Sequence, residues 1–206
     1  QSWTYWTILS IMGVSPVENN AAYQEENWTE IIDGKVIAMS PRPSINHHRV
    51  SLNIAALFSV FLKGRPCQVF GDGVDLFLSD QNRFIPDGMV VCDPDKVKRN
   101  GIHGAPDLVI EVLSPSTARY DRGYKKDAYE AAGVREYWIV EPEAKSLEVY
   151  LLKDRKFVLD NVYSIYPDYL LEKMSDEEKA AIPTEFCCSL YDDLTVTLED
   201  IFADTF

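Results

Sequence analysis

Pro106-Asp-Leu-Val-Ile-Glu-Val-Leu-Ser114 places one acid, Glu111, in the middle of an apolar run. A continuous apolar run of this length is typical of a strand that is covered on both faces. A carboxylate at such a position is desolvated, which costs free energy unless a cation or a hydrogen-bond donor meets it. From the residues alone, a metal ligand and a structural ion pair with Arg or Lys are about equally supported for Glu111.

A second acid, Asp87, lies in the strand-like segment Arg83-Phe-Ile-Pro-Asp-Gly-Met-Val-Val-Cys92. If the two segments are neighbouring strands whose acids point to one place, the pair makes a site for a divalent metal ion. Pro-Asp-Gly is also a common turn signature, so a plain turn is the alternative for Asp87. Asp107 cannot share a metal with Glu111, because four residues of strand separate them by roughly 13 Å. We expect Asp107 at the mouth of its strand or as a cap on the preceding turn.

The rest of the chain alternates between helix and strand signals that are bounded by Gly, Pro or capping residues. A hairpin is predicted over 28–39, around Asp33-Gly34, and a long helix over 46–62, capped by Ser44. The other expected elements are a bent strand over 67–79, strands over 83–92, 106–114, 136–140 and 146–152, a helix from 115 to 132, short helices starting at Ser15 and Ser175, and a strand and helix within 194–206. Residues 157–174 carry no clear pattern. This order predicts a mixed α/β sheet with at least one helix on each face.

The 206 residues suit one domain, and 46% hydrophobic and 26% charged residues are ordinary globular usage. No apolar run approaches the roughly 20 residues of a membrane helix, so we expect no membrane association. The apolar segment 3–12 has no basic residue before it, which argues against a signal peptide. The spacing of the four cysteines fits neither a metal site nor a disulfide framework. We therefore expect buried free thiols in a reducing cytoplasm.

The net charge of −13 argues, taken whole, against a nucleic-acid partner. The acidity is concentrated at the end of the chain, where residues 141–206 hold 16 acidic and 6 basic side chains. Between residues 96 and 126 the balance reverses. There the basic side chains are Lys96, Lys98, Arg99, Arg119, Arg122, Lys125 and Lys126, against only three acids.

Two further side chains could belong to a site near the acids. Lys125 follows Asp121 by one helical turn, which favours an exposed i,i+4 ion pair. The alternative is that Lys125 leans over the carboxylate site. His47 stands at the start of the long helix, where it could contact a phosphate or a metal ion. A solvated helix start is the favoured interpretation of His47.

Several blocks of the sequence together resemble the Uma2 family of restriction-endonuclease-like proteins. These blocks are Glu30-Ile-Ile-Asp-Gly-Lys35, Met39-Ser-Pro41, His47-His-Arg-Val50, Pro86-Asp-Gly88, Gly104-Ala-Pro-Asp-Leu-Val-Ile-Glu-Val-Leu-Ser-Pro-Ser-Thr117, Tyr120-Asp-Arg-Gly-Tyr-Lys125 and Tyr129-Glu-Ala-Ala-Gly-Val-Arg-Glu-Tyr-Trp-Ile-Val-Glu-Pro142. The likeness covers about residues 15–155. It implies an α/β restriction endonuclease-like PD-(D/E)xK fold, in which helices flank a central mixed sheet. We expect a single domain over 1–206, with an acidic C-terminal extension over 156–206.

The resemblance also implies an active site. Asp87 matches the first acid of the superfamily and Glu111 the second, and together they would bind Mg²⁺, with Mn²⁺ as the alternative ion. The lysine expected two residues after the second acid is absent, because Leu113 stands there. Lys125 matches the lysine of the family's helix motif and is the candidate for its role.

Two supporting residues follow from the same likeness, and Asp107 is a third candidate for a supporting role. Glu30 matches a family acid near the start of the chain, and it could complete the metal shell. His47 matches the family's histidine, although His48 stands where the family usually has Gln.

The implied function is that of a Mg²⁺-dependent endonuclease that hydrolyses DNA phosphodiester bonds, acting as a cytoplasmic homodimer. The side chains expected to hold the DNA backbone are Lys96, Lys98, Arg99, Arg119 and Arg122. Trp3, Tyr5 and Trp6 are candidates for a partner surface. The alternative is a catalytically inactive nuclease-fold protein that binds DNA or another protein. Two features favour it: Leu113 stands where the lysine is expected, and residues 141–206 are acidic. A sugar hydrolase built on two carboxylates ranks last, because it explains neither the basic side chains between residues 96 and 103 nor the family blocks.

Overall fold

The computed structural model describes residues 29–38 and 43–206 of the chain. The helix expected from Ser15 and the aromatic residues Trp3, Tyr5 and Trp6 lie outside the described residues. Among the helices that are described, none is long and apolar enough to cross a membrane.

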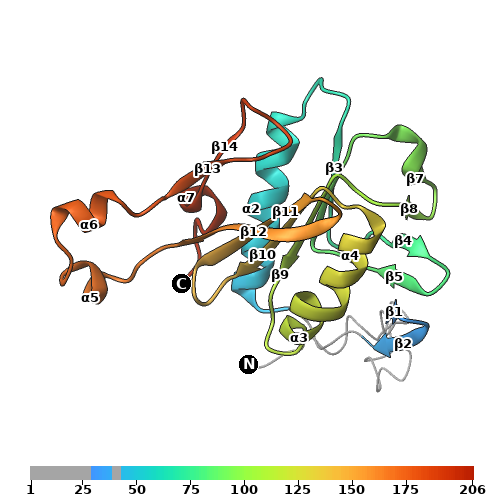
Figure 1. Cartoon of the computed structure of the whole chain (residues 1–206), viewed down its shortest axis with the longest axis horizontal. Helices are drawn as coiled ribbons and strands as arrows, with labels where there is room; N and C mark the ends of the chain where they lie inside the picture. The colour runs from blue at the N-terminus through green and yellow to red at the C-terminus, as the bar shows by residue number, and fades with distance from the viewer. Residues whose placement is uncertain (1–28, 39–42) are drawn as a thin grey trace, which may run out of the picture.

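A mixed six-stranded sheet forms the centre of the molecule (Figure 1). In spatial order its strands are β12 (Lys156–Ser164), β11 (Ser146–Lys153), β10 (Glu136–Glu141), β9 (Leu108–Val112), β6 (Gly88–Val91) and β3 (Gln68–Gly71). Strands β9 and β10 are parallel, whereas the other neighbours are antiparallel. All five residues of β9 are buried, as the apolar run around Glu111 predicts. The predicted mixed α/β sheet is confirmed.

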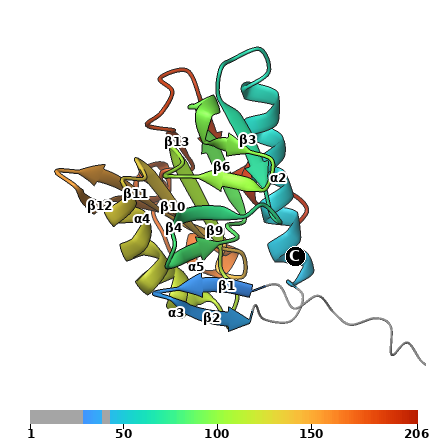
Figure 2. The same ribbon diagram turned by 90° about the vertical axis from the view of Figure 1, so that its right-hand side faces the viewer.

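Helices cover both faces of this sheet, as predicted (Figure 2). On one face lies α2 (Ile45–Phe61), which begins where Ser44 Oγ accepts a hydrogen bond from His47 N. Its apolar stripe packs Phe58 against Trp138, with ring centroids 5.7 Å apart. On the other face lie α3 (Ala118–Tyr120), the π-helix η2 (Asp121–Lys125) and α4 (Lys126–Ala132). Side chains of β9 alternate between the faces, so Leu108 and Ile110 meet the α2 side while Val109 meets the α4 side.

A second sheet lies on the α4 side of the first. In spatial order its strands are β2 (Lys35–Ala38), β1 (Thr29–Ile32), β5 (Asn82–Phe84), β4 (Leu76–Ser79), β8 (Gly101–His103) and β7 (Val97–Lys98). The predicted hairpin around Asp33-Gly34 is confirmed as β1 and β2. Between β6 and β9, residues 93–105 hold the short 3-10 helix η1 (Pro94–Lys96) and the β7–β8 hairpin.

Two of the predicted strands are wrong in the same way, because each divides between the two sheets. The segment 67–79 divides into β3 and β4, and the segment 83–92 divides into β5 and β6. Proline has no N–H to give to a strand ladder, so Pro86 favours a break at this point. The N–H of Ile85 donates instead to Glu30 Oε1, at 3.0 Å. Asp87 therefore stands at the point where the chain crosses from one sheet to the other.

The helix predicted from 115 to 132 is confirmed with one interruption. Gly123 has non-helical dihedral angles inside the π-helix η2. Single π turns of this kind often occur at functional sites, because they change which side chains face inward. Gly133 ends α4 in the left-handed conformation, with φ of 89°, as its position after the last apolar residue predicts.

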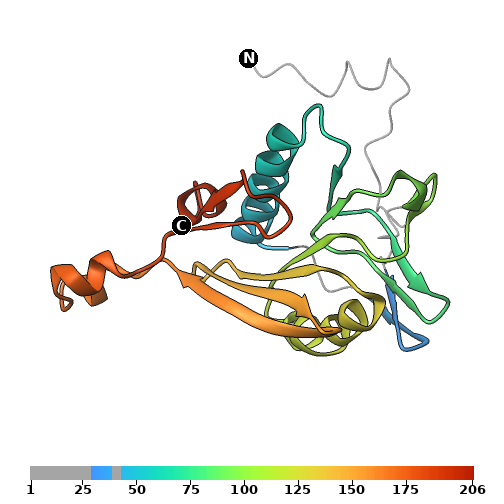
Figure 3. The same ribbon diagram turned by 45° about the horizontal axis from the view of Figure 1, so that its top comes forward.

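The C-terminal part of the chain returns to the α2 face of the sheet. Before it does so, α5 (Asp168–Leu171) and α6 (Asp176–Ala180) extend away from the body of the molecule (Figure 3). The predicted capping box at Ser175 is confirmed. Then β13 (Glu185–Cys187), β14 (Thr195–Thr197) and α7 (Leu198–Ile201) pack on α2 and β10. Buried Glu136 fixes this return, because its carboxylate accepts hydrogen bonds from Trp138 Nε1 and from Ser189 N.

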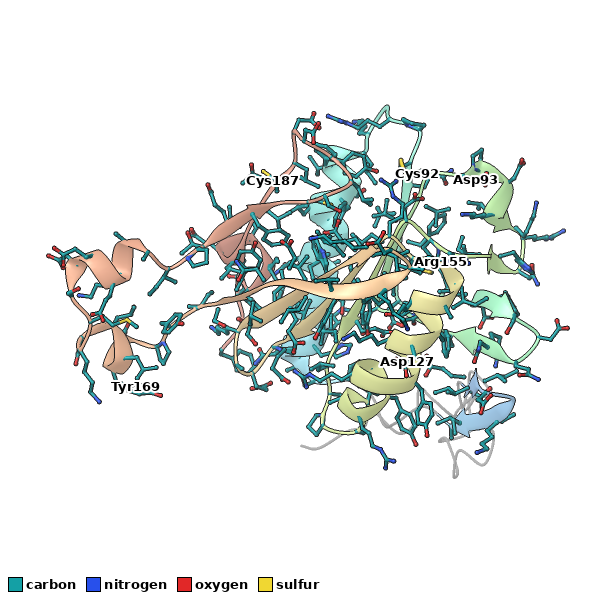
Figure 4. The ribbon with its side chains drawn as sticks, in the orientation of Figure 1. Cys92, Asp93, Asp127, Arg155, Tyr169 and Cys187 are labelled. Atoms are coloured by element: carbon teal, nitrogen blue, oxygen red, sulfur yellow. A yellow bond between two sulfur atoms is a disulfide. The ribbon has the colours of Figure 1, made fainter. Side chains whose placement is uncertain are left out.

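Cysteine chemistry departs from the sequence expectation. Cys67 and Cys92 form a disulfide, Cys188 is a buried free thiol, and Cys187 is a free thiol exposed on the C-terminal segment (Figure 4). The prediction of four free thiols is therefore wrong for the first pair. Spacing alone did not reveal the pair, because only the antiparallel register of β3 and β6 brings residues 25 positions apart together.

This disulfide is expected to stabilise the fold by shortening a loop in the unfolded chain. For two cysteines separated by 25 residues, the loss of chain entropy corresponds to about 3 kcal/mol. Cys67→Ser should therefore lower the free energy of unfolding by about 3 kcal/mol in guanidinium titrations without reductant. Cys187→Ser is the control, with little expected change, and a Cys67→Ser variant as stable as the unmodified chain would contradict the cross-link.

Candidate active site

Four charged side chains gather between the two sheets, and Lys125 is at their centre. Its Nζ lies 2.9 Å from Glu30 Oε1, 3.2 Å from Glu111 Oε1 and 3.2 Å from Asp121 Oδ1. The side chain of Lys125 is only 3% exposed, and the three acids are also buried. We call Lys125, Glu30, Glu111 and Asp121 the lysine cluster. One ammonium group is thus shared by three buried carboxylates.

Three different elements supply the lysine cluster. Glu30 points inward from β1, Glu111 from β9, and Asp121 and Lys125 from the π-helix. The predicted i,i+4 pair between Lys125 and Asp121 forms at 3.2 Å, but it is buried, because this side of the helix packs onto the sheet. Lys125 also contacts Glu30 and Glu111, and a catalytic role for it stays a prediction. Of the two interpretations of Glu111, the structure shows the ion pair, with Lys125, and a metal-binding role stays a prediction.

Tyr129 is a member of the site that the sequence reasoning missed. Its hydroxyl donates to Glu111 Oε1 at 2.7 Å, and its ring packs edge-on against Phe84 with centroids 5.3 Å apart. The side chain is fully buried. A helical stripe was the available signal, because Asp121, Lys125 and Tyr129 follow one another at intervals of four residues. Glu111 Oε1 therefore has two donors that fix the orientation of its carboxylate.

The electrostatics of the lysine cluster favour a charged lysine. Burial alone would lower the pKa of Lys125, but the attraction of Glu111, Asp121 and Glu30 outweighs it and raises the pKa well above its ordinary value. Burial raises the pKa of Glu111 well above its ordinary value, and the nearby Asp121 and Asp87 raise it further against the attraction of Lys125. The raised pKa of Lys125 and the raised pKa of Glu111 are consistent with each other, because one ammonium group cannot balance the charge of three buried carboxylates.

Asp87 and His47 form a second pair beside the lysine cluster. His47 Nε2 lies 3.4 Å from Asp87 Oδ1, and the other carboxylate oxygen accepts the N–H of Val112 at 2.7 Å. That contact places Asp87 against the residue that follows Glu111. The favoured interpretation of His47 as a solvated helix start is wrong, because the residue is buried. Burial alone would lower the pKa of His47, but the hydrogen bond and the charge of Asp87 raise it.

The donor chemistry of the site suits a hard divalent cation. The carboxylates of Glu30, Asp87, Glu111 and Asp121 exceed the charge that Lys125 and a protonated His47 can balance. Oxygen ligands of this kind favour Mg²⁺ or Mn²⁺ over zinc. Within residues 29–38 and 43–206, no three His, Cys, Asp or Glu side chains converge on one point as a ready metal centre. The oxygen donors would suit such an ion, and metal binding by Asp87 and Glu111 stays a prediction.

Asp107 lies apart from the lysine cluster. Its Oδ2 accepts the N–H of Cys92 at 2.8 Å, and its Oδ1 lies 3.4 Å from Arg135 Nη1. This contact ties the start of β9 to the end of β6, so Asp107 stabilises the local backbone, in keeping with the expected position at the mouth of its strand.

The basic residues expected to contact DNA fall into two groups. Lys96 Nζ donates to the carbonyl of Ala105 at 2.8 Å, and Arg122 forms an ion pair with Glu148 at 2.9 Å. Both side chains are thus engaged within the chain. Lys98, Arg99 and Arg119 are exposed, and within the described ranges none of them has an ion-pair partner. A DNA-binding role for these residues stays a prediction.

Comparisons with known proteins identify the same family that the sequence blocks resemble. The family model Uma2, described as "Putative restriction endonuclease", matches residues 18–174. The chain is 34% identical over 127 residues to the uncharacterized protein slr1290 of Synechocystis, a match over 61% of this chain and 66%, just under two thirds, of that protein. It is 28% identical over 141 residues to the uncharacterized protein sll1609 of the same organism, which covers 66% of this chain and 79% of that protein.

A solved structure shares the fold. The crystal structure of a DUF820 protein from Anabaena variabilis, described as a putative nuclease, matches with a TM-score of 0.64 and 20% sequence identity. The match covers 86% of this chain and 90% of the other. The restriction endonuclease-like fold expected from the sequence is confirmed.

Proposed function

The chain belongs to the Uma2 family, and from that premise we propose that it is a divalent-metal-dependent endonuclease that hydrolyses DNA phosphodiester bonds. One observation carries the proposal: Lys125 Nζ reaches to 3.2 Å from Glu111 Oε1. The strand position two residues after Glu111 holds Leu113, so the lysine of the superfamily is missing there. A lysine supplied from the following helix restores the combination of two acids and one cation.

In this proposal Asp87 and Glu111 hold Mg²⁺ or Mn²⁺, and Glu30 supports them from β1. When bound, the ion would lower the pKa of a water molecule and neutralise negative charge on the phosphate. Tyr129 and Lys125 both contact Oε1 of Glu111, which leaves Oε2 as the candidate ligand for the ion. The N–H of Val112 and the ring of His47 orient Asp87 in the same way.

Lys125 acts electrostatically in this scheme. Because its pKa is raised, it carries its proton at neutral pH and cannot accept another from water. It can donate hydrogen bonds to the attacking water or to an oxygen of the phosphoryl group as negative charge develops there. The exposed cations Lys98, Arg99 and Arg119 are the candidates for contacts with the DNA backbone. A cytoplasmic homodimer belongs to the same proposal, and light scattering would measure its mass.

Cleavage assays test the proposal directly. Supercoiled, linear and branched DNA are incubated with the unmodified chain and Mg²⁺, Mn²⁺ or EDTA, and the products are separated on gels. We expect metal-dependent cleavage that disappears in Asp87→Asn. Asp127→Asn is the matched control, because it neutralises an exposed acid on α4. Absence of cleavage for every DNA and both metals would rule out the nuclease.

A catalytically inactive nuclease-fold protein is the second candidate. It is favoured by the pairing of Glu111 with Lys125, which leaves that carboxylate partly occupied. Titration calorimetry with Mg²⁺ separates the two functions. An active centre binds the ion and loses this binding in Asp87→Asn, whereas a chain that binds DNA but no metal ion belongs to the second class.

Tyr129 provides a milder test of the same site. Tyr129→Phe keeps the ring that packs on Phe84 but removes the hydrogen bond to Glu111. Loss of such an outer hydrogen bond to a metal ligand typically costs about 10- to 100-fold in affinity or activity. We expect a loss of that size in Mg²⁺ affinity, measured by calorimetry. Tyr150→Phe is the control, since its hydroxyl bonds Glu148 away from the lysine cluster, and equal losses in both variants would contradict the role of Tyr129.

A further inference from the structure

The Cys67–Cys92 disulfide joins two neighbouring strands at one end of their ladder. Between this bond and the site stand four residue pairs: Gln68 with Val91, Val69 with Val90, Phe70 with Met89, and Gly71 with Gly88. Strand β3 is the outermost strand of the main sheet, and β6 is its only neighbour in that sheet. Among the described residues, the disulfide is the one covalent cross-link, apart from the main chain itself, between this edge strand and the rest of the sheet.

The other end of the same ladder lies at the candidate active site. Asp87 directly precedes Gly88, and Asp72 directly follows Gly71. The preceding helix α2 begins with the contact between His47 and Asp87 and then leads into Cys67. The disulfide thus clamps the unit made of α2 and β3 onto β6, the strand that follows Asp87.

The two cysteine residues differ in exposure. Cys67 is buried, whereas Cys92 is partly exposed at the end of β6, and Figure 4 marks its position. The hydroxyl of Tyr191 lies 3.6 Å from Cys92 Sγ. A thiolate approaching from solvent therefore meets Cys92 first. Exchange of a disulfide begins with such an attack on one sulfur, and the other sulfur leaves.

We propose that the Cys67–Cys92 pair is a redox-responsive clamp that controls how rigidly the active-site strands are held. A dithiol opens the clamp, and a disulfide of the same chemical class closes it. A thiolate of the dithiol attacks Cys92 Sγ, and Cys67 leaves as a thiolate that takes up a proton. The second thiol of the reagent then releases Cys92. Two electrons and two protons pass to the chain, which gains two thiols, while the dithiol becomes a disulfide. Control of cleavage by this clamp rests on the proposed nuclease function, whereas the clamp itself does not.

Alkylation tests the bond. The chain, purified without reductant, is denatured in iodoacetamide and its mass is measured before and after treatment with dithiothreitol. We expect two alkylated cysteines before reduction, Cys187 and Cys188, and four after it. Four alkylated cysteines before reduction, in protein kept under air, would overturn the proposal.

Hydrogen exchange tests the clamp in the folded chain. After reduction, the β3 amides should exchange about 10-fold faster or more, because an edge strand opens locally once its covalent tie is lost. Amides of β10, in the middle of the sheet, are the internal control. Reoxidation should restore slow exchange, and a Cys67→Ser, Cys92→Ser double variant should exchange rapidly with or without dithiothreitol. Equal exchange in the oxidised and reduced forms would refute the clamp.

Coupling to the site is measured separately, with Mg²⁺ calorimetry on both redox forms in a Cys187→Ser background. Coupling between two sites of one protein is typically about 5-fold or more, so we expect reduction to weaken Mg²⁺ binding by at least that factor. Unchanged affinity in a chain that does bind Mg²⁺ would overturn the link to the site. If neither form binds Mg²⁺, the proposed function fails, while the hydrogen-exchange result still decides whether the clamp exists.

Discussion

Lys125→Met is expected to lower the free energy of unfolding by about 3–5 kcal/mol at neutral pH. Methionine fills nearly the same space as the lysine stem, so the packing of the helix on the sheet is largely kept. The change instead removes the only ammonium group from three buried carboxylates, Glu30, Glu111 and Asp121. Removing one partner of a buried ion pair is costly, because the remaining charge has neither water nor a counter-ion. Guanidinium titration followed by circular dichroism measures the effect.

Lys126→Met is the matched control for this variant. Lys126 is the next residue along the helix, and its ammonium group lies 3.6 Å from the centroid of the Tyr150 ring, outside the lysine cluster. Its loss should cost about 1 kcal/mol or less. A Lys125→Met chain that matches Lys126→Met in stability would contradict the shared ammonium group.

The deficit of Lys125→Met should shrink as the pH falls. Without the ammonium group, the buried acids hold their protons more tightly in the folded chain than in the unfolded chain, so their folded pKa values rise. A group of this kind stabilises the fold most below its unfolded pKa and loses that contribution as the pH rises through its folded pKa. The difference from the unmodified chain should therefore be largest at neutral pH and smallest near pH 4.5.

The sequence alone predicted the core of the sheet, because burial on both faces leaves a clear apolar pattern. The apolar run around Glu111 predicted the position of β9. An apolar stripe that repeats about every four residues predicted α2, the helix that covers it. The breaks in the strands at 72–75 and 85–87 were missed. Each half of these segments has a strand pattern, and only tertiary pairing decides that the halves belong to different sheets.

The membership of the site was predicted in part for a similar reason. Glu111 stands in a buried strand, where one carboxylate among apolar residues is a clear signal. Asp87 lies in the crossing between β5 and β6, where its Pro-Asp-Gly context also fits a plain turn. Lys125 and Tyr129 follow Asp121 at helical spacing, but spacing alone does not say whether that side of the helix faces solvent or the sheet. His47 appeared solvated because its burial comes from residues distant in sequence, Asp87 and Val112 among them. Contacts of this kind are set by the fold as a whole.

Glu111→Gln is expected to abolish DNA cleavage while it stabilises the fold. Glutamine keeps the shape of the side chain and can still accept the hydrogen bond of Tyr129, but it cannot give a metal ion the charge of a carboxylate. Loss of a residue that acts as part of one catalytic unit typically lowers kcat by at least about 1,000-fold. Gel assays of cleavage with Mg²⁺ measure this loss, with Glu148→Gln as the control acid on β11.

Stability should change in the opposite direction. Because the pKa of Glu111 is raised in the folded chain, folding binds its proton and the ionised form opposes folding. The contribution of Glu111 to stability is therefore greatest below about pH 4.5, its unfolded pKa, and falls as the pH rises toward the higher folded pKa. Glutamine cannot ionise, so Glu111→Gln should gain on the order of 1 kcal/mol at neutral pH and lose this advantage in acid.

This pair of outcomes distinguishes a functional acid from a structural one. A Glu111 that served only to neutralise Lys125 would leave the ammonium group with fewer partners once it is replaced, and Glu111→Gln would then destabilise the chain. A carboxylate whose role is catalytic instead destabilises the fold when it is ionised, because Glu30 and Asp121 already pair with Lys125. Lower stability of Glu111→Gln at neutral pH, together with unchanged cleavage, would assign Glu111 to the structure and remove it from the active site.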